Sequence, residues 1–459
     1  MEDEVELLSP ERPTFGCGIF RFFCDPVTRS HRYAVLALMC FLNFGSYFCF
    51  DNPAALEDRL TASDGIALSK EQYGLLYTVY AWPNVLFPFL GGLLIDGMLG
   101  LRFAAILFAA AIMAGQVVFA VGGFGNAFWA MLVGRVLFSV GGENLAVCQN
   151  NYAVKWFKGK ELNTVFGIQL SFARIGSTVN IYTMGPIYNA MRQYYPMKPA
   201  YFLLGALSTV FSFLCALLLA FFDRRRDRTL QEQEQEEEDE EAEEETALSL
   251  RDVLELPASL WLLSAVCVAY YNAVFPLVGF GLLFYESKFQ LGPSTADAVN
   301  SLIYLISIAA SPACGVLVDY FGSNLLWVGM ATLLSIAAHC LLAFTFITPF
   351  LAVVILGIGY SLLASSLWSM VAYVVPQRLL GTAYGAMQSI QNLGQGVIFI
   401  AAGAILDAGG YFMLELFFIF WLSVALGFTI LLYFVDTSLS GGILSARKNK
   451  QIALLEKRE

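Results

Sequence analysis

The sequence predicts an all-α membrane protein with twelve transmembrane helices in two pseudo-symmetric six-helix bundles. Of its 459 residues, 58% are hydrophobic and 14% are charged, whereas soluble domains carry about a quarter charged residues. The apolar residues come in blocks that are long enough to cross a bilayer, which takes about 20 residues of helix. Segments of the two chain halves also repeat one another, which favours two related bundles.

Twelve predicted spans follow from these blocks in chain order. The first bundle, residues 33–223, contains the spans 33–50, 74–95, 102–121, 127–152, 164–188 and 200–222. The second bundle, residues 257–436, contains the spans 260–284, 298–318, 325–347, 350–375, 382–406 and 412–435. The remaining segments are an N-terminal tail (1–32), a linker (224–256) and a C-terminal tail (437–459).

The basic residues predict that both chain ends lie in the cytosol. Of the 26 Lys and Arg residues, 19 fall on the side of the N-terminus, five fall on the opposite side, and Arg135 and Arg174 lie inside spans. Cytosolic loops carry an excess of Lys and Arg. An even number of spans keeps both termini on that side.

The linker between the bundles carries a run of acidic residues. Segment 232–245 contains eleven acids and no Lys or Arg, so −11 plus 11 leaves the rest of the chain neutral. A neutral body gives no indication of nucleic-acid binding. High charge with low hydrophobicity predicts a disordered cytosolic linker. A solubilising spacer is the simpler interpretation, and a partner-binding segment is the alternative.

Two pairs of segments repeat across the halves. GGLLIDGMLGLR (91–102) follows the second span, and GVLVDYFG (315–322) follows the eighth. TVFGIQLSFARIG, which begins at Thr164, aligns with TAYGAMQSIQNLG, which begins at Thr382. Such repeats are typical of secondary transporters, in which two bundles move around a site near the bilayer midplane.

These segments resemble the major facilitator superfamily, whose loop after the second span carries Gly-x-x-x-Asp-Arg-x-Gly-Arg-Arg. The matching residues are Gly92, Asp96, Gly100 and Arg102, with one extra residue before the second glycine, and in the second copy Gly315, Asp319 and Gly322. The second copy keeps the spacing but lacks the basic tail. The resemblance implies the major facilitator fold and a gating role for these residues.

Three longer strings are similar to a narrower family of lysosomal dipeptide transporters within that superfamily. They are NFGSYFCFDNPAAL (43–56), the segment 156–180 with WFKGKELN and ARIGSTVN, and GTAYGAMQSIQNLG (381–394). This resemblance implies facilitated diffusion of dipeptides across the lysosomal membrane. It also implies association with a heavily glycosylated lysosomal membrane protein.

Opposite charges occur at equal depth in the fourth and fifth spans. Glu143 lies ten residues before Ala153, and Arg174 lies ten residues after Thr164. At about 1.5 Å per residue, each sits roughly 15 Å from the cytosolic edge, near the middle of a core about 30 Å thick. A guanidinium binds a carboxylate through a planar fork, and a carboxylate binds a protonated amine. We therefore expect Glu143 and Arg174 to face one cavity and to clamp the termini of a dipeptide.

Other interpretations of the charged residues stay open. Glu143 and Arg174 could form a permanent ion pair between two helices, or a gating pair that breaks during transport. Arg135 lies about 12 Å from Glu143 along the same helix, and we expect it to have a structural or gating role. His339 is the only histidine in its span and Glu415 lies near a span end, so we expect no proton relay, which favours a uniporter.

Aromatic and amide side chains are expected to complete the binding cavity. The candidates in the second half are Tyr271, Trp368, Gln388 and Gln391. Aromatic rings provide an adaptable apolar wall, and amides provide hydrogen bonds. Each of them taken singly is also a common helix-packing residue in membranes.

The N-terminal tail contains an acidic dileucine pattern in DEVELLSP. Asp3 lies four residues before the pair Leu7 and Leu8, which predicts recognition by a clathrin adaptor and sorting to the lysosome. The chain contains no Asn-x-Ser/Thr sequon. A glycosylated accessory protein would shield it in a protease-rich lumen, in agreement with the partner that the resemblance implies.

Motif content argues against an enzyme. The nine Cys and two His show no metal-ligand spacing, and no phosphate loop or activated nucleophile occurs, so we expect no cofactor. The main hypothesis is a uniporter that exports dipeptides from the lysosomal lumen by alternating access. The alternatives are a transporter of another small organic solute, such as an organic anion or a sugar, and a non-transporting membrane scaffold for the glycosylated partner.

Overall fold

The computed structural model describes residues 29–61, 67–194, 200–234, 256–439 and 441–455. Within these ranges the chain is built from helices and contains no named strand. The predicted sorting residues Asp3, Leu7 and Leu8 lie outside them, as do residues 235–245 of the acidic run.

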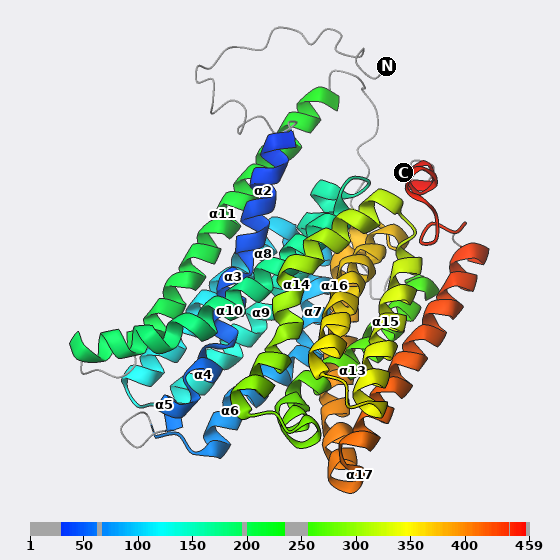
Figure 1. Ribbon diagram of the computed structural model, residues 1–459. Coiled ribbons are helices and arrows are strands. Elements are labelled where there is room, and N and C mark those ends of the chain that lie inside the picture. The colour runs from blue at the N-terminus through cyan, green and yellow to red at the C-terminus, as the bar shows by residue number, and fades with distance from the viewer. Residues whose placement is uncertain (1–28, 62–66, 195–199, 235–255, 440, 456–459) are drawn as a thin grey trace.

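The helices form two bundles that lie side by side (Figure 1). The first bundle comprises α2 (Arg29–Leu42), α3 (Phe44–Phe50), α4 (Asn52–Ala55), α5 (Glu57–Thr61), α6 (Lys70–Ala81), η1 (Pro83–Val85), α7 (Phe87–Leu94), η2 (Ile95–Leu99), α8 (Gly100–Phe124), α9 (Phe128–Phe157), α10 (Leu162–Tyr194) and α11 (Ala200–Glu234). The second comprises α13 (Ala258–Phe289), α14 (Pro293–Phe321), α15 (Asn324–Phe344), α16 (Pro349–Val374), η3 (Gln377–Leu379), α17 (Leu380–Leu439) and α18 (Lys448–Leu455). The start of α2 and the short α18 lie at the same end of the molecule, the predicted cytosolic end.

These helices accommodate the twelve predicted spans. In the described part of the chain, nine helical stretches are long and apolar enough to cross a membrane. Two of them, Phe87–Phe124 and Gln377–Leu439, are long enough to include parts of two predicted spans each, and α10 carries the remaining one. The second long stretch breaks at Gly410, whose φ of 70° lies in the left-handed region that glycine adopts without strain.

The second span is interrupted near its middle. Pro83 begins the 3-10 turn η1, which separates α6 from α7, because proline has no N–H for the helical hydrogen-bond ladder. This break places Trp82 and Asn84 beside α17, where they line a cavity.

The repeated Gly-x-x-x-Asp motif joins the two halves at the predicted cytosolic end. Asp96 accepts hydrogen bonds from the backbone N–H groups of Gly381 (3.0 Å) and Thr382 (2.6 Å) at the start of α17. A carboxylate at a helix N-terminus satisfies unpaired N–H groups and the positive end of the helix dipole. Gly92 is required here because a Cβ atom would collide with the backbone carbonyl of Gly381.

The second copy of the motif makes the equivalent contact with α10. Asp319 accepts from the backbone N–H groups of Asn163 (3.1 Å) and Thr164 (2.6 Å), from the Asn163 amide (2.8 Å) and from the Thr164 hydroxyl (2.6 Å). A Cβ atom on Gly315 would meet the backbone of Asn163 and Thr164. The two aspartates thus pair with Thr164 and Thr382, the residues that the sequence repeat aligns.

The other motif residues act within their own halves. Arg102 pairs with Asp223 at 2.6 Å and with Asp227, both on α11. Gly100 and Gly322 have φ values of 67° and 71° at the turns that follow their aspartates, which only glycine adopts without strain. The gating role of the whole set stays a prediction.

Two predicted boundaries differ from the helix limits. Helix α11 continues to Glu234, so the beginning of the predicted disordered linker is helical. Its extension is anchored by Asp227, which pairs with Lys155 at 3.0 Å, and by Arg226, which stacks on Trp156. The C-terminal tail also packs on the second bundle, since Leu444 donates to the buried Asp436.

Candidate functional site

A cavity of about 160 Å³ lies between the two bundles; we call it the central cavity. It is lined from the first half by α3, α9 and α10, and from the second half by α13, α16 and α17. Of the six predicted binding residues, five line it: Arg174, Tyr271, Trp368, Gln388 and Gln391. Residues from both halves therefore meet at one site, as transport between two moving bundles requires.

Arg174 is the only basic residue among those that line the central cavity. Its guanidinium donates a hydrogen bond to the Tyr360 hydroxyl and lies over the Tyr304 ring, 4.1 Å from the ring centre. Its Nε atom is buried and has no hydrogen-bond partner. An unpaired buried donor is costly, so this guanidinium is poised to take an acceptor from a bound molecule.

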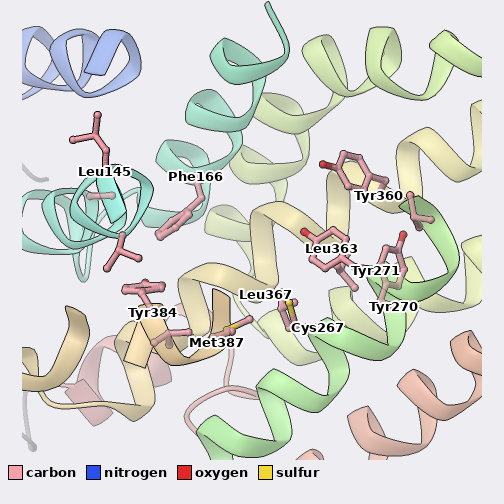
Figure 2. Packing of buried hydrophobic residues seen from close by; sticks show 14 of the residues in the cluster. Leu145, Phe166, Cys267, Tyr270, Tyr271, Tyr360, Leu363, Leu367, Tyr384 and Met387 are labelled. Carbon is pink, nitrogen blue, oxygen red and sulfur yellow. The ribbon is translucent and has the colours of Figure 1, made fainter. Parts of the chain in front are cut away.

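The aromatic wall of the central cavity is held by contacts within the second half, where Tyr271 and Tyr360 lie close together (Figure 2). The Trp368 indole N–H donates to the Tyr271 hydroxyl at 3.3 Å. The Tyr271 ring stacks on Phe275 with 5.2 Å between centres, and its edge meets Tyr360 at 6.2 Å. Tyr384 donates to the Trp368 carbonyl at 3.0 Å. Hydrogen bonds and ring contacts hold this wall in one arrangement.

Glu143 lines a different cavity from Arg174. This side cavity has a volume of about 490 Å³ and lies between α6 with η1 on one side and α17 on the other. The Glu143 carboxylate accepts a hydrogen bond from the Tyr80 hydroxyl at 3.3 Å. The structure thus differs from the expectation that Glu143 and Arg174 face one cavity.

The difference has a geometric reason. Rise along a helix gives the height of a residue, whereas its direction depends on a rotation of about 100° per residue. The sequence spacing predicts equal heights in the membrane for Glu143 and Arg174. It does not predict the directions in which their side chains point. Among the described residues the two side chains form no ion pair, since Glu143 bonds to Tyr80 and Arg174 to Tyr360. A permanent ion pair between them is therefore absent in this conformation.

Tyr47 lies near both charged groups. It lines the central cavity and interacts electrostatically with both Glu143 and Arg174.

Arg135 has a closed environment on the same helix as Glu143. Its side chain is fully buried, and its three nitrogens donate to the backbone carbonyls of Leu76, Cys49 and Phe50, each at 3.4 Å. Five aromatic rings surround the guanidinium, with centres 5.4 to 5.9 Å from its carbon atom: Phe50, Tyr77, Tyr80, Phe119 and Phe138. This environment agrees with a structural role and leaves no guanidinium nitrogen without a hydrogen bond.

His339 has a carboxylate partner in the second bundle. Its Nδ1 atom lies 2.8 Å from a carboxylate oxygen of Glu415, and both side chains are buried. Neither residue lines the central or the side cavity. The pair joins α15 to α17, helices whose contact the sequence did not predict.

Sequence reasoning missed the partners of Arg174. Tyr360 and Tyr304 come from α16 and α14 and complete its surroundings. The available signal was a single tyrosine in an otherwise apolar or small-residue stretch, GIGYSLLASS for Tyr360 and LIYLISIAAS for Tyr304. Such tyrosines place one hydroxyl deep in a span. Within the described residues, no group of three or more His, Cys, Asp or Glu side chains could hold a metal ion.

Comparison with known families and proteins adds to this geometry. The family model described as Major Facilitator Superfamily matches residues 36–399 and 282–456. The chain is similar to the protein named lysosomal dipeptide transporter MFSD1 of Homo sapiens, with 46% identity over 456 residues, 98% of this chain and 95% of the relative. The protein of the same name from Danio rerio is 48% identical over 425 residues, 92% of this chain and 90% of the relative. That from Gallus gallus is 44% identical over 462 residues, 98% and 97%.

Solved structures share the fold at low identity. The human organic anion transporter MFSD10 (TETRAN) superposes with a TM-score of 0.62 at 16% identity, covering 87% of this chain and 99% of that one. The transporter FucP from the major facilitator superfamily, in the outward conformation, gives 0.64 at 14%, covering 86% and 98%. A bacterial homologue of the iron transporter ferroportin in its outward-facing state gives 0.68 at 13%, covering 87% and 98%.

Proposed function

The chain belongs to the major facilitator superfamily, and from this premise we propose that it exports dipeptides from the lysosomal lumen to the cytosol. The fold is that of a multi-pass membrane transporter with twelve helices. The substrate and the lysosomal address rest on the names of relatives that share nearly half of its residues over almost its full length.

Recognition of a dipeptide would use both of its charged ends. The observation that carries the proposal is Arg174, a buried guanidinium with an unpaired donor in the cavity between the halves. It would bind the carboxylate of the dipeptide, and Glu143 would bind the protonated amine. Two extended residues reach at most about 7 Å, so binding at both ends would require the two charged groups to come within that reach, with one end of the peptide in each cavity.

Alternating access would proceed by exchange of contacts between the halves. Hydrogen bonds that Asp96 and Asp319 accept hold the predicted cytosolic ends of the bundles together. Release of substrate to the cytosol would break these bonds and close the opposite end. Uniport is the simplest mode for this chain, because the pair His339–Glu415 lies away from both cavities.

The test uses the melting temperature of the purified protein with three forms of one dipeptide. The free dipeptide should raise it, whereas the N-acetylated and the C-amidated forms should lose most of the effect, because each lacks one charge. The melting temperature of the Glu143→Gln variant should rise only slightly with the free dipeptide, and by the same amount with the N-acetylated form. Glu71→Gln, which changes an exposed acid of the same bundle, serves as the matched control. Full stabilisation by both blocked forms would reject the clamp.

A transporter of another organic solute is the second candidate. It is favoured by the separation of the charges, because the central cavity itself contains Arg174 and no acid. If Glu143→Gln keeps full activity while Arg174→Gln loses it, the substrate is a simple anion. A third candidate is a scaffold for a partner, and liposomes with pure protein that exchange no labelled solute would support it.

Sorting and association with a partner complete the proposal. Asp3, Leu7 and Leu8 would direct the protein to lysosomes through a clathrin adaptor, and a glycosylated lysosomal membrane protein would shield it. Replacement of Leu7 and Leu8 by alanine should redirect the tagged protein to the cell surface. Unchanged lysosomal staining would remove the dileucine signal from the proposal.

A further inference from the structure

The two cavities differ in size and in charge. The side cavity has about 490 Å³ and the central cavity about 160 Å³, roughly a threefold difference. Glu143 lines only the larger cavity, and Arg174 lines only the smaller one. Any zwitterion that bridges these charges is therefore oriented, with its amine at the larger cavity.

The wall of the side cavity is largely apolar and open. Its side chains include Trp82, Leu393, Val397 and Ile400. Trp82 and Ile400 lie in predicted membrane spans, where an exposed apolar side chain meets lipid instead of water. The gain on binding therefore comes from the ligand's own apolar side chain, which leaves water for this wall. An apolar group beside a protonated amine matches both this wall and the carboxylate of Glu143.

The wall of the central cavity is more polar and more constrained. Gln388 and Gln391 contribute amides to it, and the network of Tyr271, Trp368 and Tyr360 fixes its aromatic face. Enlarging this cavity would separate rings that contact one another, whereas the side cavity has room without rearrangement. Large groups are thus accommodated on the side of Glu143 only.

We infer that the protein reads the order of residues in a dipeptide, taking a large apolar side chain at the first position and a small one at the second. The first residue carries the amine, so its side chain lies at the side cavity. The second residue carries the carboxylate, so its side chain lies in the small central cavity. This inference rests on the proposed dipeptide transport and names its substrate class.

Isomeric dipeptides test the inference directly. Leu-Gly and Gly-Leu contain the same atoms and the same charged termini, so the Glu143 and Arg174 contacts contribute equally to both. We expect the apparent affinity measured by counterflow in liposomes to be about tenfold higher for Leu-Gly than for Gly-Leu, because the apolar side chain of Leu-Gly is buried. Equal affinity, or preference for Gly-Leu, would overturn the inference. This comparison requires only the wild-type protein.

A variant that fills the side cavity sharpens the test. Gly396 on α17 lines this cavity, and a Cβ atom there would meet no atom within 4 Å. Gly396→Leu should therefore occupy the cavity without displacing the helix. It should weaken Leu-Gly by about tenfold, and weaken Gly-Leu, which places only a glycine there, by a smaller factor. Gly427→Leu is the matched control, because Gly427 lies on the same helix, is exposed, has equal space around it and lines neither cavity.

The outcomes separate this inference from the proposed function. Equal effects of Gly396→Leu on both isomers, or no effect on either, would overturn the assignment of the first side chain to the side cavity while dipeptide transport stands. Wild-type protein that exchanges neither isomer, nor any dipeptide of a mixed pool, would overturn dipeptide transport itself.

Discussion

Arg135 and Arg174 are the two basic residues inside the predicted spans, and their surroundings differ in one decisive respect. All three nitrogens of Arg135 donate to backbone carbonyls, and five rings close around it. Arg174 donates to the Tyr360 hydroxyl, rests on Tyr304 and keeps a buried Nε without a partner. Both are costly to place in a membrane, yet only Arg135 has a hydrogen bond at every guanidinium nitrogen.

The difference shows how a charged residue that stabilises the fold can be distinguished from one that binds a ligand. A position inside a span does not distinguish them, because both lie within predicted spans of the first bundle. Their hydrogen bonds do: a guanidinium bonded at every nitrogen stabilises the fold, whereas one with an unbonded nitrogen beside a cavity retains binding capacity. Substitution of Arg174 should therefore lower ligand affinity and leave stability unchanged, whereas substitution of Arg135 should lower stability and leave ligand affinity unchanged.

The largest effect is expected for Arg174→Gln. Loss of one partner from a desolvated charge pair costs about 2–5 kcal/mol, and 1.4 kcal/mol is tenfold, so dipeptide affinity should fall by about thirtyfold or more. The unfolding midpoint without ligand should stay close to that of the wild type, because the variant removes an unsatisfied donor. Ligand titration and thermal unfolding of the same preparation measure both quantities. A large loss of stability in the absence of ligand would show that Arg174 has a structural role, and the distinction from Arg135 would fail.

The next effect is expected for Arg135→Gln, on stability instead of affinity. The variant leaves buried carbonyls without donors, at about 1–3 kcal/mol for each unsatisfied group, and removes the ring contacts of the guanidinium. The midpoint of denaturation should fall by several degrees, while the affinity of the folded fraction for a dipeptide stays within about twofold. Wild-type stability together with lost transport would assign Arg135 to gating, the alternative that the sequence also allowed.

Much of the fold was predictable from the sequence, for reasons that particular residues make clear. Apolar blocks of membrane-crossing length predicted the twelve spans, and the motif glycines Gly92 and Gly315 marked where helices of opposite halves touch. The backbone N–H groups of the aligned residues Thr164 and Thr382 donate hydrogen bonds to the two motif aspartates. These features depend on local composition and on repeats, which a single sequence contains.

The candidate site was only partly predictable, because its contacts join distant segments. Helical rise predicted equal depths for Glu143 and Arg174 but could not predict their directions, and the two residues line separate cavities. His339 meets Glu415 across two helices, and no spacing rule links them. Tyr360, the direct partner of Arg174, lies 186 residues away. Side-chain direction and helix neighbours are set by packing of the whole bundle.

The smallest effect is expected for Tyr360→Phe, which alters the surroundings of Arg174 without touching its charge. The hydroxyl accepts from the guanidinium, so its removal frees a second donor and loses one hydrogen bond, worth about 0.5–1.5 kcal/mol. If this bond orients the guanidinium toward the central cavity, dipeptide affinity should fall by about two- to tenfold. Tyr270→Phe is the control, because that buried hydroxyl bonds to Ser335 and does not line the cavity. If instead Tyr360→Phe raises affinity, the tyrosine competes with the substrate carboxylate, and the open state of Arg174 is reached only when this bond breaks.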